Sequence, residues 1–121
     1  MRSVGTDGRT ARGMVTAELA VAILAAFSLF LLLCWGLVLI GLQLCCVDTA
    51  AAVARQEARA DKAAVDQARA EAPRGAVIRV DRRPGQVRVE VTLRARPFVR
   101  GLPTVPLHAE ATVVPEPGVS R

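Results

Sequence analysis

The fold of this chain is decided by residues 13–46, which read GMVTAELAVAILAAFSLFLLLCWGLVLIGLQLCC. From Leu19 to Leu42 the stretch has no ionisable side chain except cysteine, so it exceeds the ~20 apolar residues that cross the hydrocarbon core of a bilayer. We therefore predict that residues 14–46 are the transmembrane part of a helix. Glu18 stands at the leading end of this span, where a charged side chain is costly and is a functional candidate by default.

Residues 1–13 form a basic leader ahead of the span, with three Arg against one Asp. A conventional secretory signal has an apolar region of ~7–15 residues followed by a small-residue cleavage site. The apolar run here is much longer and ends without such a site, so we expect the span to stay in the mature protein. Because Lys and Arg are retained on the cytoplasmic side, the leader favours a cytoplasmic N-terminus and an extracytoplasmic C-terminus in a single-pass membrane protein.

The helical signal continues beyond the membrane over residues 47–72, which contain mostly Ala, Arg, Glu, Gln and Asp and neither Gly nor Pro. Pro73 and Gly75 then end it. The pattern predicts one helix from about Val15 to Ala72. Its outer part is polar around most of its circumference apart from an alanine-rich seam, formed by Ala50, Ala51, Ala54 and Ala58. Such a helix needs neighbours to be stable.

Residues 73–121 are predicted to form a small β-rich extracytoplasmic domain. Apolar and polar residues alternate over 86–96, which is the strongest strand signal in the chain. A shorter run, 76–80, precedes it across Asp-Arg-Arg-Pro-Gly and predicts a hairpin, and 107–113 alternates as a third strand. The predicted class is α+β: a long N-terminal helix, transmembrane in its first half, followed by an antiparallel sheet of about three strands packed on the helix.

The sequence shows no signature of an enzyme. It has no nucleophile paired with a suitable base, no carboxylate dyad in a pocket-forming segment and no Gly-rich phosphate loop. We expect no catalytic residue and no cofactor. The one histidine, His108, lies on the polar side of the last predicted strand without a second ligand nearby in sequence, so we expect it to be solvated and expect no metal site.

The cysteines do not suggest a disulfide framework. Cys34 lies within the span, and Cys45 and Cys46 lie at its far end. Neighbouring residues on a helix point about 100° apart, so Cys45 and Cys46 cannot bridge each other within a helix. We interpret all three as small apolar packing residues, with a disulfide between chains or a lipid-modified thiol as the alternative.

The net charge of +5 resides in residues 73–121, which contain nine Arg against four acids. A basic segment attracts nucleic acid, anionic lipid or acidic cell-wall polymer. Phe98 is the only aromatic residue beyond the span, and it cannot supply the base stacking of single-strand binders. Nucleic acid is therefore an improbable partner, whereas membrane lipid is an expected one.

Residues 12–18 read RGMVTAE and precede a long apolar helix, an order that resembles the processing site of type IV prepilins. The Thr-Ala-Glu element, the short length and the small β-rich tail are most similar to TadE-like minor pilins, or pseudopilins, of tight-adherence (Flp) pilus systems. The resemblance implies that a prepilin peptidase cuts between Gly13 and Met14, which makes Glu18 the fifth residue of the mature chain. It also implies other pilins or pseudopilins and a pilus assembly platform as partners, the bacterial cytoplasmic membrane as location, and incorporation in an extracellular pilus as a further option.

Physical chemistry makes the implied cut intelligible. Cleavage after Gly13 creates an α-amino cation at Met14, about one helical turn from Glu18. A carboxylate entering the apolar phase needs a partner, and a neighbouring subunit's terminal amine can supply one. Such a contact joins the start of one chain to Glu18 of another, and repeated head-to-tail contacts that do not close form filaments.

A second interpretation remains open from the residues alone. The chain can be a bitopic, signal-anchored membrane protein whose basic extracytoplasmic domain binds a polyanion or a partner protein. Loss of residues 1–13 distinguishes the two, since only the pilin-like interpretation requires it.

Overall fold

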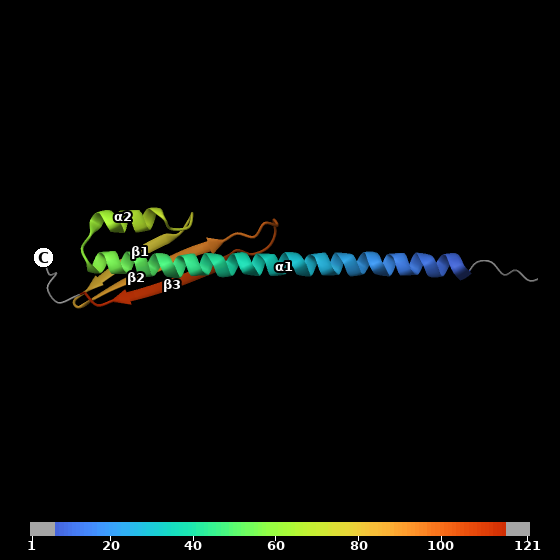
Figure 1. Cartoon of the computed structure of the whole chain (residues 1–121), viewed down its shortest axis with the longest axis horizontal. Helices are drawn as coiled ribbons and strands as arrows, with labels where there is room; N and C mark the ends of the chain where they lie inside the picture. Colours follow the sequence, from blue (N-terminus) through green and yellow to red (C-terminus); the bar gives the residue numbers. More distant parts are fainter. Residues whose placement is uncertain (1–6, 116–121) are drawn as a thin grey trace, which may run out of the picture. The chain divides into compact units, whose positions relative to one another are not determined.

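The computed structural model describes residues 7–115, with side chains from residue 11 onward. Residues 1–6 of the predicted leader and residues 116–121 of the predicted β-rich domain lie outside this range. The chain divides into two units, Met1–Gly36 and Leu37–Arg121. The elements, shown in Figure 1, are α1 (Asp7–Ala58), α2 (Lys62–Ala70), β1 (Val77–Arg83), β2 (Gln86–Ala95) and β3 (Val105–Val113). The predicted α+β class, a long N-terminal helix followed by a three-stranded antiparallel sheet, is confirmed.

The described part of the first unit is the leading part of α1, which is rich in the strong helix formers Ala and Leu. The helix satisfies its backbone groups internally, as a lipid-exposed segment must. It begins at Asp7, earlier than the predicted Val15, so the last residues of the leader are helical. Side chains of this unit from residue 11 to residue 33 are exposed.

The three strands of the second unit form one sheet in the order β1-β2-β3, with both pairings antiparallel. Arg83 pairs with Gln86, so the hairpin between β1 and β2 has a two-residue loop, Pro84-Gly85. Gly85 has a φ of 83°, which a residue with a side chain rarely adopts, and Pro before Gly suits a tight turn. The predicted hairpin is present, and its loop is shorter than the five-residue connection expected because β1 continues through Arg83.

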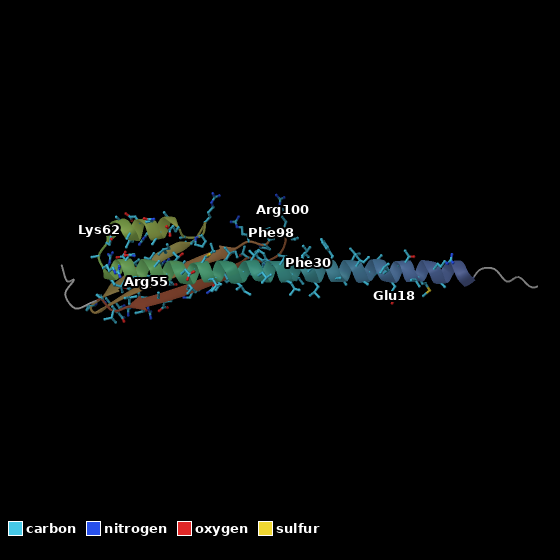
Figure 2. All side chains as sticks on the ribbon, in the orientation of Figure 1. Glu18, Phe30, Arg55, Lys62, Phe98 and Arg100 are labelled. Carbon is cyan, nitrogen blue, oxygen red and sulfur yellow. The ribbon has the colours of Figure 1, made fainter. Side chains whose placement is uncertain are left out.

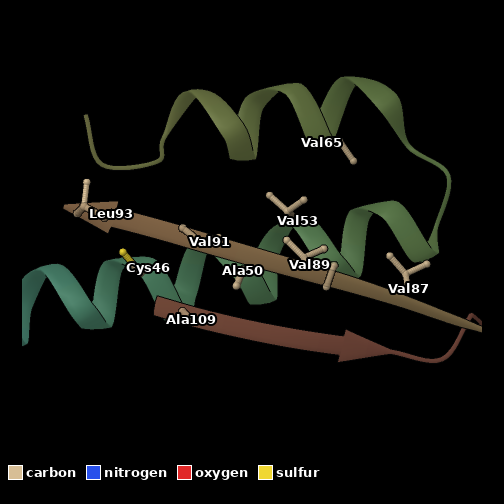
Figure 3. Packing of buried hydrophobic residues seen from close by; sticks show 10 residues of the cluster. Cys46, Ala50, Val53, Val65, Val87, Val89, Val91, Leu93 and Ala109 are labelled. Carbon is tan, nitrogen blue, oxygen red and sulfur yellow. The ribbon is translucent and has the colours of Figure 1, made fainter. Parts of the chain in front are cut away.

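The core of the second unit lies between the inner face of the sheet and the last part of α1 (Figure 3). Every second residue of β2 from Val87 is buried, as the alternation predicts. On the helix, Ala50 and Ala54 of the predicted alanine-rich seam are buried with Val53. The neighbour that this helix requires is therefore the protein's own sheet.

The structure corrects the prediction of one helix up to Ala72. The chain leaves the helix after Ala58, Ala60 takes a left-handed φ of 58°, and Asp61 caps α2 by accepting a hydrogen bond from Ala64 N at 3.1 Å. A left-handed alanine costs about 1 kcal/mol. The turn lets α2 contribute Val65 to the core, which offsets this cost.

An ion pair between Glu57 of α1 and Arg82 of β1 joins the end of the helix to the sheet. Arg82 shares the inner side of β1 with Val80, and its guanidinium donates two hydrogen bonds to Oε2 of Glu57, one of them from Nε at 3.2 Å. The Glu57 side chain is only 8% exposed, whereas that of Arg82 is 69% exposed. The carboxylate is thus largely removed from water and depends on Arg82 for its partner.

We expect Arg82→Gln to lower the free energy of unfolding of the second unit by about 1 kcal/mol, because it deprives a mostly buried carboxylate of its charged partner. Arg83→Gln is the matched control. Arg83 pairs with Asp81 at 3.0 Å, but both side chains are more than half exposed, so its loss should cost no more than about 0.5 kcal/mol. Chemical denaturation of the full chain in detergent measures both, and equal effects would contradict the role given to Glu57.

Candidate functional site

The predicted processing site lies on the surface of α1. Gly13, Met14 and Glu18 all belong to this helix, and Met14 is 72% exposed. Residues four apart on a helix share one side, so Glu18 lies one turn beyond Met14 on the same side (Figure 2 labels Glu18). An α-amine created at Met14 would therefore begin the helix one turn before the carboxylate.

Glu18 has no partner among the described side chains, since no hydrogen bond or ion pair joins it to any of residues 11–115. Two hydroxyl groups near it are satisfied locally. Thr16 Oγ1 donates to Arg12 O at 2.9 Å, and Ser28 Oγ donates to Leu24 O at 2.8 Å. The Glu18 carboxylate thus stands at the start of the apolar stretch without a partner among the side chains of residues 11–115.

Gly13 is free of steric constraint. A Cβ built on it meets no heavy atom within 4 Å, and its backbone is helical. Glycine in a helix costs about 1 kcal/mol relative to alanine, so the helix is locally weakened next to the predicted scissile bond. A protease needs the backbone opened around that bond, and opening is easiest where the helix is weakest and carries no tertiary packing.

The surface around the site is apolar beyond what a soluble monomer exposes. Large side chains of α1 are about 40–70% exposed in the isolated chain, among them Val21, Leu24, Phe27, Phe30 and Leu33. Among the described residues, one helix is long and apolar enough to cross a membrane, and its most apolar window has a mean hydropathy of 2.7 with none of it buried. A helix of this kind near the N-terminus is compatible with single-pass anchoring in a membrane.

The cysteines are free thiols with different surroundings. Cys46 is fully buried and belongs to the core, Cys34 is partly buried, and Cys45 is exposed. Packing is the role the structure assigns to Cys46. The proposal of an interchain disulfide or a lipid modification is sterically open only for the other two.

His108 lies on the outer face of the sheet and is exposed, with its Nδ1 at 3.5 Å from Oε1 of Glu90. Its carbonyl oxygen accepts a hydrogen bond from Gln43 Nε2 at 2.8 Å, which ties β3 to α1. Within residues 7–115 no group of three or more His, Cys, Asp or Glu side chains is arranged to hold a metal ion.

Two features escaped the sequence analysis. The first is the Glu57–Arg82 pair. Its signal in the sequence is that Arg82 lies an even number of residues after Ile78 and Val80, and therefore on the same, inner side of the strand. The second feature is the connection 96–104 between β2 and β3. It combines exposed apolar side chains with Arg residues, and its signal is the absence of any acid between Glu90 and Glu110.

Comparison with known proteins gives one informative relative. The chain is 40% identical over 103 residues to "Apoptosis inhibitor Rv3655c" of Mycobacterium tuberculosis, and the match covers 84% of this chain and 78% of that protein. No family model matches the sequence, and no solved structure matches it significantly. The extent and identity of the match show that the chain belongs to the family of this mycobacterial protein.

Proposed function

We propose that the protein is a TadE-like minor pilin or pseudopilin, processed after Gly13, that takes part in assembly of a type IV (Flp/Tad) pilus or a related secretion machinery. One observation carries the proposal. Glu18 is an unpartnered carboxylate, among the described residues, at the start of a long apolar helix, and it stands five residues after the glycine of RGMVTAE. A long N-terminal helix followed by a small sheet is the architecture such a role requires, and it supports the proposal.

The proposed mechanism uses the charge that processing creates. Removal of residues 1–13 makes Met14 the first residue of α1 and gives it an α-ammonium group. In the proposed assembly this cation pairs with Glu18 of an adjacent pilin, while the exposed apolar side chains of the two helices pack together. The low dielectric constant around the helices strengthens the pairing, and an unpaired carboxylate there is strongly disfavoured.

The proposed location is the bacterial cytoplasmic membrane, with the N-terminus in the cytoplasm and the second unit outside. The Arg residues of the leader support this orientation. The prepilin peptidase then meets its site at the cytoplasmic surface, and the sheet is presented to partner pilins and to the assembly platform on the other side. The remaining alternative is a signal-anchored protein whose basic domain binds a polyanion or a partner protein.

A second candidate function comes from the family. The mycobacterial relative is named as an inhibitor of apoptosis, and 40% identity favours the same effect for this chain. The effect concerns a eukaryotic cell, so it is compatible with a protein displayed outside a bacterium. Caspase activity in cultured eukaryotic cells in which apoptosis has been induced, compared between native and heat-denatured protein in lipid nanodiscs, tests it directly. Equal caspase activity with both samples removes this candidate.

Gly13→Ala tests the proposed processing. We expect the wild-type chain to lose residues 1–13 when it is co-expressed with a prepilin peptidase, and Gly13→Ala to retain them. The substitution fits the structure without a clash and favours the helix slightly, so a block cannot be attributed to misfolding. Intact mass of the membrane-extracted protein reads the outcome.

Gly8→Ala is the matched control for this experiment. It removes another leader glycine and leaves the predicted scissile bond untouched, so it should be processed like the wild type. If Gly13→Ala is shortened as efficiently as Gly8→Ala, the proposed cleavage after Gly13 is wrong.

A further inference from the structure

The connection between β2 and β3 is an exposed apolar tip with basic flanks. Residues 96–104 read RPFVRGLPT. The large apolar side chains are Phe98 at 82%, Val99 at 60% and Leu102 at 53% exposure. Three arginines lie on or beside this tip, namely Arg94, Arg96 and Arg100. Apolar side chains rimmed by one sign of charge mark an interaction surface.

A groove adjoins this tip at the same end of the sheet. It has a volume of ≈ 830 Å³ and is lined by apolar side chains that include Leu42, Leu93 and Leu107. Arg74, Arg94 and Arg96 also line it. The groove thus combines an apolar floor with a rim of guanidinium groups. The rim is complementary to the phosphate of a phospholipid headgroup, and the floor is complementary to the upper part of the acyl chains.

The position of the tip along α1 follows from contacts within the second unit. Gln43 bonds to the backbone of His108, and Leu42 lines the groove with the last residues of β2. The connection 96–104 follows the last residue of β2. It therefore lies at the end of the second unit that contains its first residue, Leu37. Figure 2 shows Phe98 and Arg100 at the end of this unit opposite to Arg55 and Lys62.

Counting residues places the same end at the membrane surface. The predicted transmembrane part, residues 14–46, is longer than the hydrocarbon core, so its ends lie in the headgroup regions. A hydrocarbon core that begins at Leu19 and takes ~20 helical residues ends near Val38. Leu42 lies four residues later, about 6 Å along the helix axis. The tip and the groove are therefore at the depth of the lipid headgroups, where arginine meets phosphate and apolar side chains reach the acyl boundary.

We propose that the tip (Pro97–Pro103) and the arginine-rimmed groove form a membrane-docking surface that binds anionic phospholipid of the leaflet from which α1 emerges. The inference rests on the membrane anchoring in the proposed function. Phe98, Val99 and Leu102 enter the interface, and Arg94, Arg96 and Arg100 bind lipid phosphates.

Tryptophan quenching in reconstituted full-length chain tests the surface. Phe98→Trp in a Trp35→Phe background places one fluorophore in the tip, and Pro84→Trp in the same background places it in the exposed hairpin turn at the other end of the sheet. In vesicles of phosphatidylcholine and phosphatidylglycerol carrying brominated acyl chains, we expect strong quenching and a blue shift for Trp at 98. Trp at 84 should be unquenched. Equal emission of the two variants overturns the proposal and points to a protein partner for the tip.

The proposed binding of lipid phosphates by the arginines is tested by varying the charge of the lipid and of the protein. Quenching at 98 should increase when phosphatidylglycerol is added to phosphatidylcholine, and replacement of Arg94, Arg96 and Arg100 by Gln should abolish this increase. Replacement of Arg69, Arg79 and Arg83 removes the same charge from exposed positions elsewhere and should preserve it. A response that the control triple variant also loses contradicts a specific lipid contact at the tip.

Quenching of Trp35 in the wild-type chain distinguishes failure of the membrane anchoring from failure of the docking surface. It lies within the apolar stretch, so brominated lipid should quench it whenever the chain spans the bilayer. If Trp35 is unquenched, the anchoring in the proposed function fails. If Trp35 is quenched and Trp at 98 is not, only the docking surface is wrong.

Discussion

Glu18→Gln should leave removal of residues 1–13 intact and reduce incorporation into pilus assemblies at least about 100-fold. The substitution keeps the shape of the side chain and removes its charge, so the terminal ammonium of the adjacent subunit loses its partner. Breaking a buried ion pair in this way costs about 3–5 kcal/mol. A free-energy difference of 1.4 kcal/mol is a factor of ten, so the loss is large enough to measure in sheared pilus fractions.

Ser28→Ala is the control for this prediction, since it removes a polar group from the same apolar stretch. Its hydroxyl already donates to Leu24 O within the helix, so it does not need a hydrogen-bond acceptor from another chain. We expect it to be processed and incorporated like the wild type. Wild-type incorporation of Glu18→Gln, measured beside it, would remove the function assigned to this carboxylate.

Val91→Asp should unfold the sheet of the second unit. Val91 is fully buried at the centre of β2, between Ile78 of β1 and Ala109 of β3. An unpaired carboxylate at this position costs several kcal/mol, a large share of the roughly 5–15 kcal/mol that stabilises a small domain. Val91→Ala leaves only a small cavity, and we expect it to cost about 2 kcal/mol.

Limited proteolysis of the full chain in detergent measures the effect, with new cuts expected between Val77 and Val113 for Val91→Asp. Thr92→Asp is the matched control, because the next residue lies on the opposite, exposed face of the same strand. It should resist the protease like the wild type. If both variants are equally resistant, the core lies elsewhere.

The main elements of the fold could be predicted because each one is specified locally. The apolar stretch from Leu19 onward is long enough to cross a bilayer and so favours a helix. In β2 the apolar residues alternate with polar ones, and they share one face only when the segment is a strand. The limits of β1 and β3 were less accurate. Asp81 and Arg83 carry no strand signal of their own, and they are held in β1 by pairing with β2.

The end of α1 could not be read from the sequence. Residues 59–61 contain neither Gly nor Pro, and the decisive gain is the burial of Val65 after the chain reverses, a tertiary effect. Asp61 was available as a capping residue, but aspartate also occurs within helices. The Glu57–Arg82 pair likewise depends on the packing of the helix on the sheet, which fixes which Arg of the chain reaches that carboxylate.

The candidate site was predictable in position only. The spacing of Gly13 and Glu18 identifies the residues, and the structure places both on one exposed helix. The described side chains contain no partner for Glu18, so the structure of a single chain cannot identify the protein that the proposed assembly requires. The tip at 97–103 was overlooked because short Pro-rich connections are usually only links between strands.

The most direct measurement of the central claim is the mass of the chain extracted from the membranes of bacteria that naturally produce it. The account predicts a mature protein that begins at Met14 and lacks the basic leader. A chain that still begins at Met1 would contradict it, because no new α-amine would then exist to pair with Glu18, and the protein would be a membrane-anchored domain without the proposed route to assembly.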